Sequence, residues 1–83
     1  MWNIRLFEIP LGPNQKLTPA GYLQKNIGGD YHVAVEIIEN HIHKYDLHGR
    51  DEEQDSWWCR RVSDKTNTVL VIEGASASPE TGP

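Results

Sequence analysis

The segment Thr68–Glu73 (TVLVIE) limits the folds open to this chain more than any other stretch. Its β-branched and apolar residues are typical of a strand that is buried inside a sheet. Ser56–Val62 (SWWCRRV) also reads as a strand, and the short turn-forming segment between the two predicts an antiparallel hairpin. Trp2–Ile9 alternates between apolar and polar residues, which indicates a third strand. We therefore expect TVLVIE in the centre of an antiparallel sheet.

A short helix is predicted after the first strand. Thr18 stands directly before Pro19, the arrangement of an N-cap followed by proline in the first helical position. Gly28 is placed to end this helix, which we expect to run from Pro19 to about Ile27. Leu17–Leu23 (LTPAGYL) resembles the start of a helix in winged-helix regulators, but the likeness is confined to this short segment, and we draw no function from it.

A longer helix is predicted over Asp30–Leu47. Apolar residues recur there at spacings of three and four, over a stretch longer than the roughly four to eight residues of most strands. Asp30 suits the N-cap and Gly49 suits the stop. The front of the segment also alternates with a period of two, so a strand over His32–Ile38 followed by a short helix stays open as the alternative.

These elements predict an α+β fold in the order strand, helix, helix, strand, strand. The expected architecture is a small three-stranded antiparallel sheet with the long helix packed on one face, which leaves the other face thinly covered. Residues 1–73 would form this single domain. Residues 74–83 (GASASPETGP) contain no large apolar side chain, and we expect them to be a flexible tail.

Size and charge count against several classes of function. A chain of 83 residues favours shallow binding surfaces over a deep catalytic pocket. Its formal net charge of −4 argues against a protein that binds duplex nucleic acid. Its one cysteine cannot form an internal disulfide, and no stretch approaches the roughly 20 apolar residues of a membrane span. We expect an acidic cytoplasmic protein with no cofactor and no membrane partner, and the sequence favours a non-enzymatic role.

The adjacent Trp57 and Trp58 are the most informative pair of residues. Neighbouring residues of a strand point to opposite faces of the sheet, so one tryptophan is expected under the long helix and the other on the uncovered face. Arg60 shares the face of Trp58, and the first strand adds Phe7. Tryptophan, phenylalanine and arginine are enriched in protein interfaces, so Trp58, Arg60 and Phe7 form the first candidate binding surface.

The charged loop Arg50–Asp55 (RDEEQD) is a second candidate surface. Its acidic residues are Asp51, Glu52, Glu53 and Asp55. Runs of this kind are usually solvated, but an acidic patch can also bind a basic partner. The spacing of the oxygen ligands does not match a calcium-binding loop.

His41, His43, His48 and Cys59 are weak candidates for a metal site. Helical positions two apart point in different directions, so His41 and His43 cannot share a metal within a helix, whereas His48 would share the helical face of His41. The paired spacing that is typical of zinc ligands is missing. We prefer solvated histidines at a helix end, and a Cys59 that acts as a small buried hydrophobic residue if Trp57 is in the core.

The sequence thus favours a small non-enzymatic protein-binding domain, either an interaction or an inhibitor domain, such as an accessory protein of a phage or mobile element. It would act through the aromatic and arginine face or through the acidic loop, on another protein or on a second copy in a homodimer. One alternative is a metal-binding or small hydrolytic protein that uses the three histidines and Cys59. The other is a binder of single-stranded nucleic acid through Trp58 and the arginines, a ligand that the negative net charge disfavours.

Overall fold

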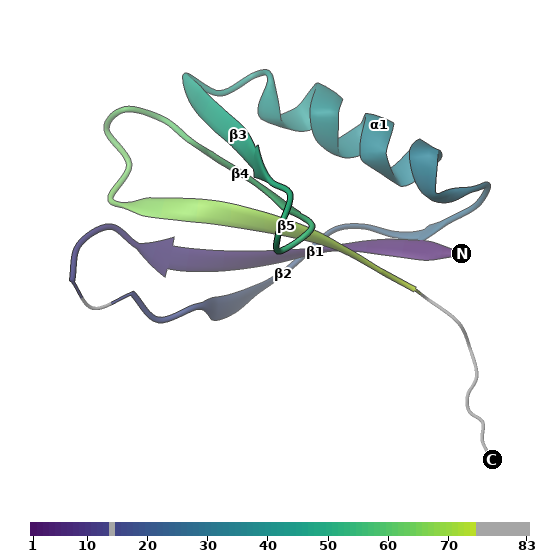
Figure 1. The fold of residues 1–83 in the computed structure, drawn as a ribbon, viewed down its shortest axis with the longest axis horizontal. Coiled ribbons are helices and arrows are strands. Elements are labelled where there is room, and N and C mark those ends of the chain that lie inside the picture. Colours follow the sequence, from purple (N-terminus) through teal and green to yellow (C-terminus); the bar gives the residue numbers. More distant parts are fainter. Residues whose placement is uncertain (14, 75–83) are drawn as a thin grey trace, which may run out of the picture.

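The chain forms a five-stranded antiparallel sheet with the helix α1 across one face (Figure 1). A computed structural model describes residues 1–13 and 15–74. In chain order the elements are β1 (Trp2–Pro10), β2 (Thr18–Ile27), α1 (Tyr31–Ile42), β3 (Leu47–Asp51), β4 (Ser56–Arg60) and β5 (Thr66–Gly74). The strand order is β2-β1-β5-β4-β3, with every neighbouring pair antiparallel.

The apolar strand β5 occupies the centre of the sheet, as its sequence predicts. It pairs with β1 on one side and with β4 on the other, so that Leu70 lies opposite both Leu6 and Trp57. The predicted hairpin of β4 and β5 is confirmed. The central position follows from burial, because a strand with apolar side chains on both faces is shielded most where strands lie on both sides of it.

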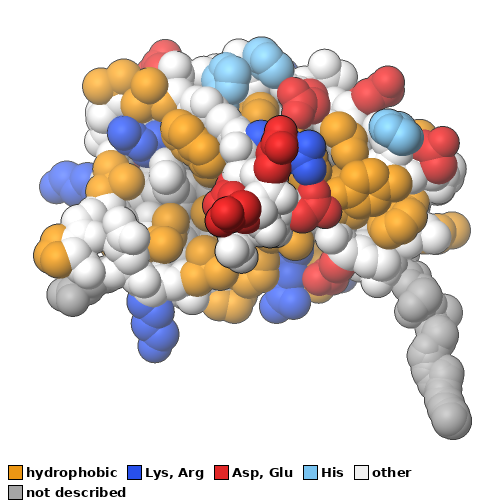
Figure 2. Space-filling model, viewed as in Figure 1, with side chains coloured by type: hydrophobic (Ala, Val, Ile, Leu, Met, Phe, Trp, Pro, Cys, Tyr) orange, Lys and Arg blue, Asp and Glu red, His pale blue; other side chains and the backbone are white. Residues whose placement is uncertain are grey.

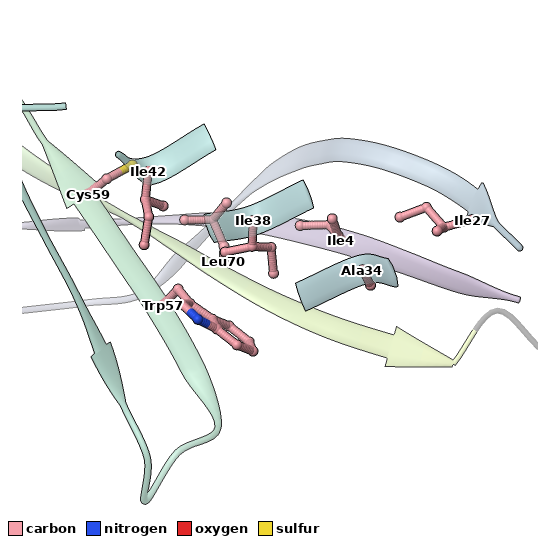
Figure 3. Close-up of a cluster of buried hydrophobic side chains, with 8 residues drawn as sticks. All are labelled: Ile4, Ile27, Ala34, Ile38, Ile42, Trp57, Cys59 and Leu70. Atoms are coloured by element: carbon pink, nitrogen blue, oxygen red, sulfur yellow. The ribbon is translucent and has the colours of Figure 1, made fainter. Parts of the chain in front are cut away.

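The core lies between α1 and the sheet (Figure 3). Its fully buried members are Ile4, Ile27, Ala34, Ile38, Ile42, Trp57, Cys59 and Leu70. α1 begins where the sequence predicts, because the Asp30 side chain accepts a hydrogen bond of 3.0 Å from the backbone N–H of His32 and so caps the helix. The alternative of a strand over His32–Ile38 is wrong.

The predicted helix over residues 19–27 is wrong, because this segment is the edge strand β2. Gly21 has a φ of +100° and Asn26 a φ of +57°, whereas a right-handed helix needs about −63° at every residue. β2 follows β1 through several register shifts, and an edge strand tolerates Pro19. Most side chains of β2 are exposed, so apolar and polar residues do not alternate in its sequence as they do in a half-buried strand. The resemblance of Leu17–Leu23 to a helix start therefore does not hold.

The long helix is also shorter than predicted, and it ends at Ile42. The apolar spacing continues to Tyr45 because that side chain packs against the core from a turn. Leu47 and His48 then belong to β3, which pairs with β4. The expectation that His48 shares a helical face with His41 is therefore wrong. Hydrogen bonds to the following strand, β4, outweigh the helical pattern here.

These two changes overturn the predicted three-stranded sheet with a long helix: β2 and β3 add a strand at each edge, and the helix has 12 residues. The predicted tail began at residue 74, but β5 continues to Gly74. The remaining residues of that tail, 75–83, lie outside the described part of the chain. Within residues 1–13 and 15–74, no helix is both long and apolar enough to cross a membrane.

Candidate functional site

The sheet has one face under α1 and one face without a helix (Figure 1). Alternation along the strands separates the two sets of side chains. Trp57, Cys59 and Leu70 point to the helix and are fully buried, whereas their neighbours Trp58 and Val69 point away and are half-buried. We call the helix-free side the open face. It carries Arg5, Phe7, Ile9, Tyr22, Trp58, Arg60, Val69, Val71 and Glu73.

The two adjacent tryptophans divide between the faces, which confirms the sequence prediction. Trp57 is fully buried, and its indole N–H donates a hydrogen bond of 2.8 Å to the Glu39 carboxylate on α1. Figure 3 shows it in the same layer as Leu70 and Ile38, beneath the helix. The guanidinium of Arg50 lies 4.7 Å from the Trp57 ring centre. Trp58 is therefore the tryptophan that is available on the open face.

A row of apolar side chains crosses the open face through the middle of the sheet. Phe7 of β1 lies opposite Val69 of β5, Val69 lies opposite Trp58 of β4, and Trp58 lies opposite Gly49 of β3. A Cβ atom at Gly49 would come within 2.7 Å of the Trp58 indole nitrogen. Glycine thus leaves room for the indole to lie across β3, and the row spans four strands without a charged residue.

Arg5 sets one border of this row. Its guanidinium lies 5.2 Å from the Phe7 ring centre and 5.8 Å from that of Tyr22, and it pairs with Glu73 at 3.7 Å. The Tyr22 hydroxyl donates a hydrogen bond of 3.3 Å to the same carboxylate. Lys25 lies 4.6 Å from the Tyr22 ring centre. These contacts hold a cation beside the aromatic row and compensate part of its charge with Glu73.

Arg60 sets the other border of the row. It lies opposite Leu47 of β3 and is half-buried, so it stays accessible beside Trp58. The structure thus brings Trp58, Arg60 and Phe7 to one face, as the sequence predicts. Sequence reasoning named Arg5 only as a positive charge for nucleic acid, and it missed Val69, Val71 and Tyr22. The strand assignments already contained a signal for the two valines, because Val69 and Val71 alternate with the buried Leu70. Tyr22 was hidden by its assignment to a helix.

Acidic residues lie in the β3–β4 turn, where red side chains gather in the middle of Figure 2. The Asp51 side chain accepts hydrogen bonds from the backbone N–H groups of Glu53 and Gln54, at 3.1 and 3.2 Å, and so shapes the turn. Glu52 and Glu53 are exposed. In the predicted acidic loop, Asp51 therefore stabilises the turn, whereas the carboxylates of Glu52 and Glu53 are exposed to solvent.

Asp55 ties the acidic turn to the rest of the fold. It accepts hydrogen bonds from Arg50 at 2.6 Å and from the Tyr31 hydroxyl at 2.9 Å, which links the turn to the first turn of α1. Burial and this hydrogen bond to a carboxylate raise the pKa of Tyr31. Asp55 also has a φ of +50°, a left-handed conformation that aspartate tolerates better than most residues. Its contacts are those of a structural residue.

The histidines and the cysteine are only partly brought together. The His43 and His48 rings lie 4.6 Å apart between centres, and His48 lies opposite Cys59. His41 instead lies against Tyr45, at 5.4 Å. Burial and the nearby Lys44 lower the pKa of His41, and burial raises that of the Cys59 thiol to about 11. Within residues 1–13 and 15–74, no three metal-binding side chains form a cluster.

The described part of the chain contains no pocket, so its candidate binding features are all surfaces. Cys59 is buried and has a raised pKa, the opposite of the exposed thiolate that nucleophilic catalysis needs. No protein-family model matches the chain, and no curated protein or solved structure matches it either. The surfaces that could bind a partner or ligand are therefore the open face, the acidic turn and the histidines.

Proposed function

We propose that this protein is a small non-enzymatic protein-binding domain, of the interaction or inhibitor type, and that the open face is its contact surface. The observation that carries the proposal is the row of Phe7, Val69 and Trp58, which is apolar, half-buried and without a covering helix. Side chains held in cross-strand register lose little further freedom on binding, which lowers the entropic cost of association. The proposal places the protein in the cytoplasm, where a free thiol such as Cys59 persists.

The composition of the surface also fits protein recognition. Interface centres are depleted of charge and enriched in aromatic residues and arginine, and a few such residues carry most of the binding energy. The open face has this arrangement, with Trp58 and Phe7 in the row and with Arg5 and Arg60 at its borders. Glu52 and Glu53 of the acidic turn would be a secondary contact for a basic partner, because Asp51 and Asp55 already serve the fold.

Affinity capture with matched variants tests the proposal. The baits are the wild type, Trp58→Ala, and Val33→Ala as the control, since Val33 is exposed on α1 rather than on the open face. We expect a purified partner to bind the wild type and the control alike, and to bind Trp58→Ala at least about tenfold more weakly. Equal affinity of a purified partner for all three baits would contradict the role of the open face.

Single-stranded nucleic acid is a second candidate ligand, because bases stack on exposed aromatic rings that have arginines beside them. Trp58 and Phe7, with Arg5 and Arg60, supply both components on one face. The net charge of −4 and the pairing of Arg5 with Glu73 weaken the attraction for phosphates. Quenching of tryptophan fluorescence by an oligonucleotide, which weakens steeply as salt is raised, would favour this candidate.

The metal-binding or hydrolytic alternative has less support. It rests on the ring pair of His43 and His48, with His41 directed elsewhere and Cys59 buried. A rise in the melting temperature on addition of zinc, reversed by a chelator, is the observation that it requires.

A further inference from the structure

We infer that the partner that covers the open face is a second copy of this chain, packed face to face about a two-fold axis that runs along β5. The inference rests on the proposed function and names the partner of that same surface. In the resulting assembly, two sheets would form a sandwich with the two α1 helices on the outside. Trp58 of each copy would lie against Phe7 of the other.

The size of the open face calls for a broad partner. β1 and β5 have nine residues each, so they are about 30 Å long at roughly 3.3 Å per residue. Four spacings of about 4.8 Å make the sheet about 19 Å wide. A single bound peptide strand would cover about a quarter of this width. A second sheet would cover all of it. The covered area would be at most about 570 Å² per partner, because β3 and β4 have only five residues each, which is the size of a weak interface rather than of a standard one.

Neither α1 nor the sequence that follows β5 supplies an apolar cover for the open face. α1 is committed to the opposite side of the sheet, where Ile38 and Ile42 enter the core. Residues 75–83 (ASASPETGP) hold no large apolar side chain that could fill the space between Phe7 and Trp58. A second copy of the open face would supply an apolar cover of matching shape.

The arrangement of the open face is compatible with two-fold symmetry. β5 is the middle strand of five, and Phe7 and Trp58 lie one strand away from Val69 on either side. A two-fold axis along β5 exchanges the two sides, so Trp58 meets Phe7 of the second copy and Phe7 meets its Trp58. Such reciprocity is what a two-fold interface requires, and aligned packing of two sheets about 10 Å apart supplies the geometry.

The charges on the open face also permit this arrangement. Arg60 follows Trp58 by two residues and would lie opposite Ile9 of the second copy, while Arg5 would lie opposite its Ser56. Like charges therefore do not face each other. Arg5 already pairs with Glu73 of its own chain, so its positive charge would be partly neutralised within the interface.

Light scattering across a concentration series tests the inference, and a charge swap tests the orientation. We expect the wild type to be a dimer. Trp58→Lys and Phe7→Glu should each weaken the dimer more than about tenfold, because each places two unpaired charges in the interface. An equimolar mixture of the two variants should recover dimers, since Lys at position 58 then meets Glu at position 7 while the second Trp58–Phe7 contact stays intact. Val33→Lys on α1 is the control and should remain dimeric.

Several results would overturn the inference. A wild type that is monomeric up to about 1 mM excludes the second copy. The broader proposal would then be judged separately, by whether a purified foreign partner still depends on Trp58. If Trp58→Lys and Phe7→Glu are each monomeric and their mixture does not form dimers, the two-fold axis does not run along β5. If circular dichroism shows either variant unfolded, Ile9→Lys repeats the test at the border of the row. It should weaken the dimer, because it sets a Lys against Arg60 of the other copy, and mixing with Arg60→Glu should recover dimers.

Discussion

Replacing Trp57 with phenylalanine, with Trp58→Phe as the matched control, tests the division of the two tryptophans between the faces. Trp57 is fully buried and donates its indole N–H to Glu39, whereas Trp58 is half-buried and lies over Gly49. The two substitutions remove the same atoms from neighbouring positions in one strand. Any difference in the free energy of unfolding therefore reports the surroundings of the two side chains.

The expected cost for Trp57→Phe has two parts. Loss of the donor removes a hydrogen bond to the partly buried Glu39 carboxylate, and a hydrogen bond to a charged group contributes about 1–3 kcal/mol. The smaller ring leaves a cavity under α1, which adds about 1 kcal/mol. The sum of about 2–4 kcal/mol is a large fraction of the roughly 4–12 kcal/mol total expected for 83 residues. Trp58→Phe should cost less than about 1 kcal/mol.

Urea denaturation followed by circular dichroism measures both values. A double-mutant cycle with Glu39→Ala should give a coupling energy of about 1–2 kcal/mol for Trp57 and close to zero for Trp58. If the two substitutions cost the same, or if Trp58→Phe costs more, then the two faces have been assigned the wrong way round. Trp58 would then not be available for binding on the open face.

Three further predictions concern single positions. Gly49→Ala should force the Trp58 indole aside and cost about 1–3 kcal/mol in urea denaturation, whereas an unchanged midpoint would show that the two residues do not touch. Native Cys59, buried and with a pKa of about 11, should react with iodoacetamide at about pH 8 at least about 100-fold more slowly than in urea, and equal rates would place it at the surface. Burial and Lys44 lower the pKa of His41, so the unfolded state binds more protons and stability falls as pH drops below about 6.5. His41→Gln should reduce the loss of unfolding free energy between about pH 7.5 and pH 5, and an unchanged loss would assign the pH dependence to other groups.

The parts of the candidate site that were predictable from the sequence rest on alternation along one strand. Trp57 and Trp58 are adjacent, so any strand through them separates them between two faces, and the same alternation adds Arg60 to the face of Trp58. The partners of Trp58 were less predictable. Gly49 belongs to a strand that the sequence does not signal, and its contact with the indole depends on register.

The two edge strands were missed for a common reason. β2 is exposed on most of its length and bends through bulges, so it has no apolar alternation, and Thr18 with Pro19 imitates a helix start. β3 follows α1 closely, and the apolar spacing of the helix runs on to Tyr45. Edge strands gain their stability from hydrogen bonds to a neighbour, and such bonds leave little trace in side-chain pattern.

The sequence by itself determined the features whose physical cause is local. Asp30 caps the following helix, β-branched residues make Thr68–Glu73 part of the central strand, and adjacency separates Trp57 from Trp58. Tertiary structure decided where the sheet ends, where the helix stops and which residues share the open face. These outcomes depend on which strands pair and in what register, and the free energy of that pairing is set by which neighbours are available rather than by the propensity of either segment.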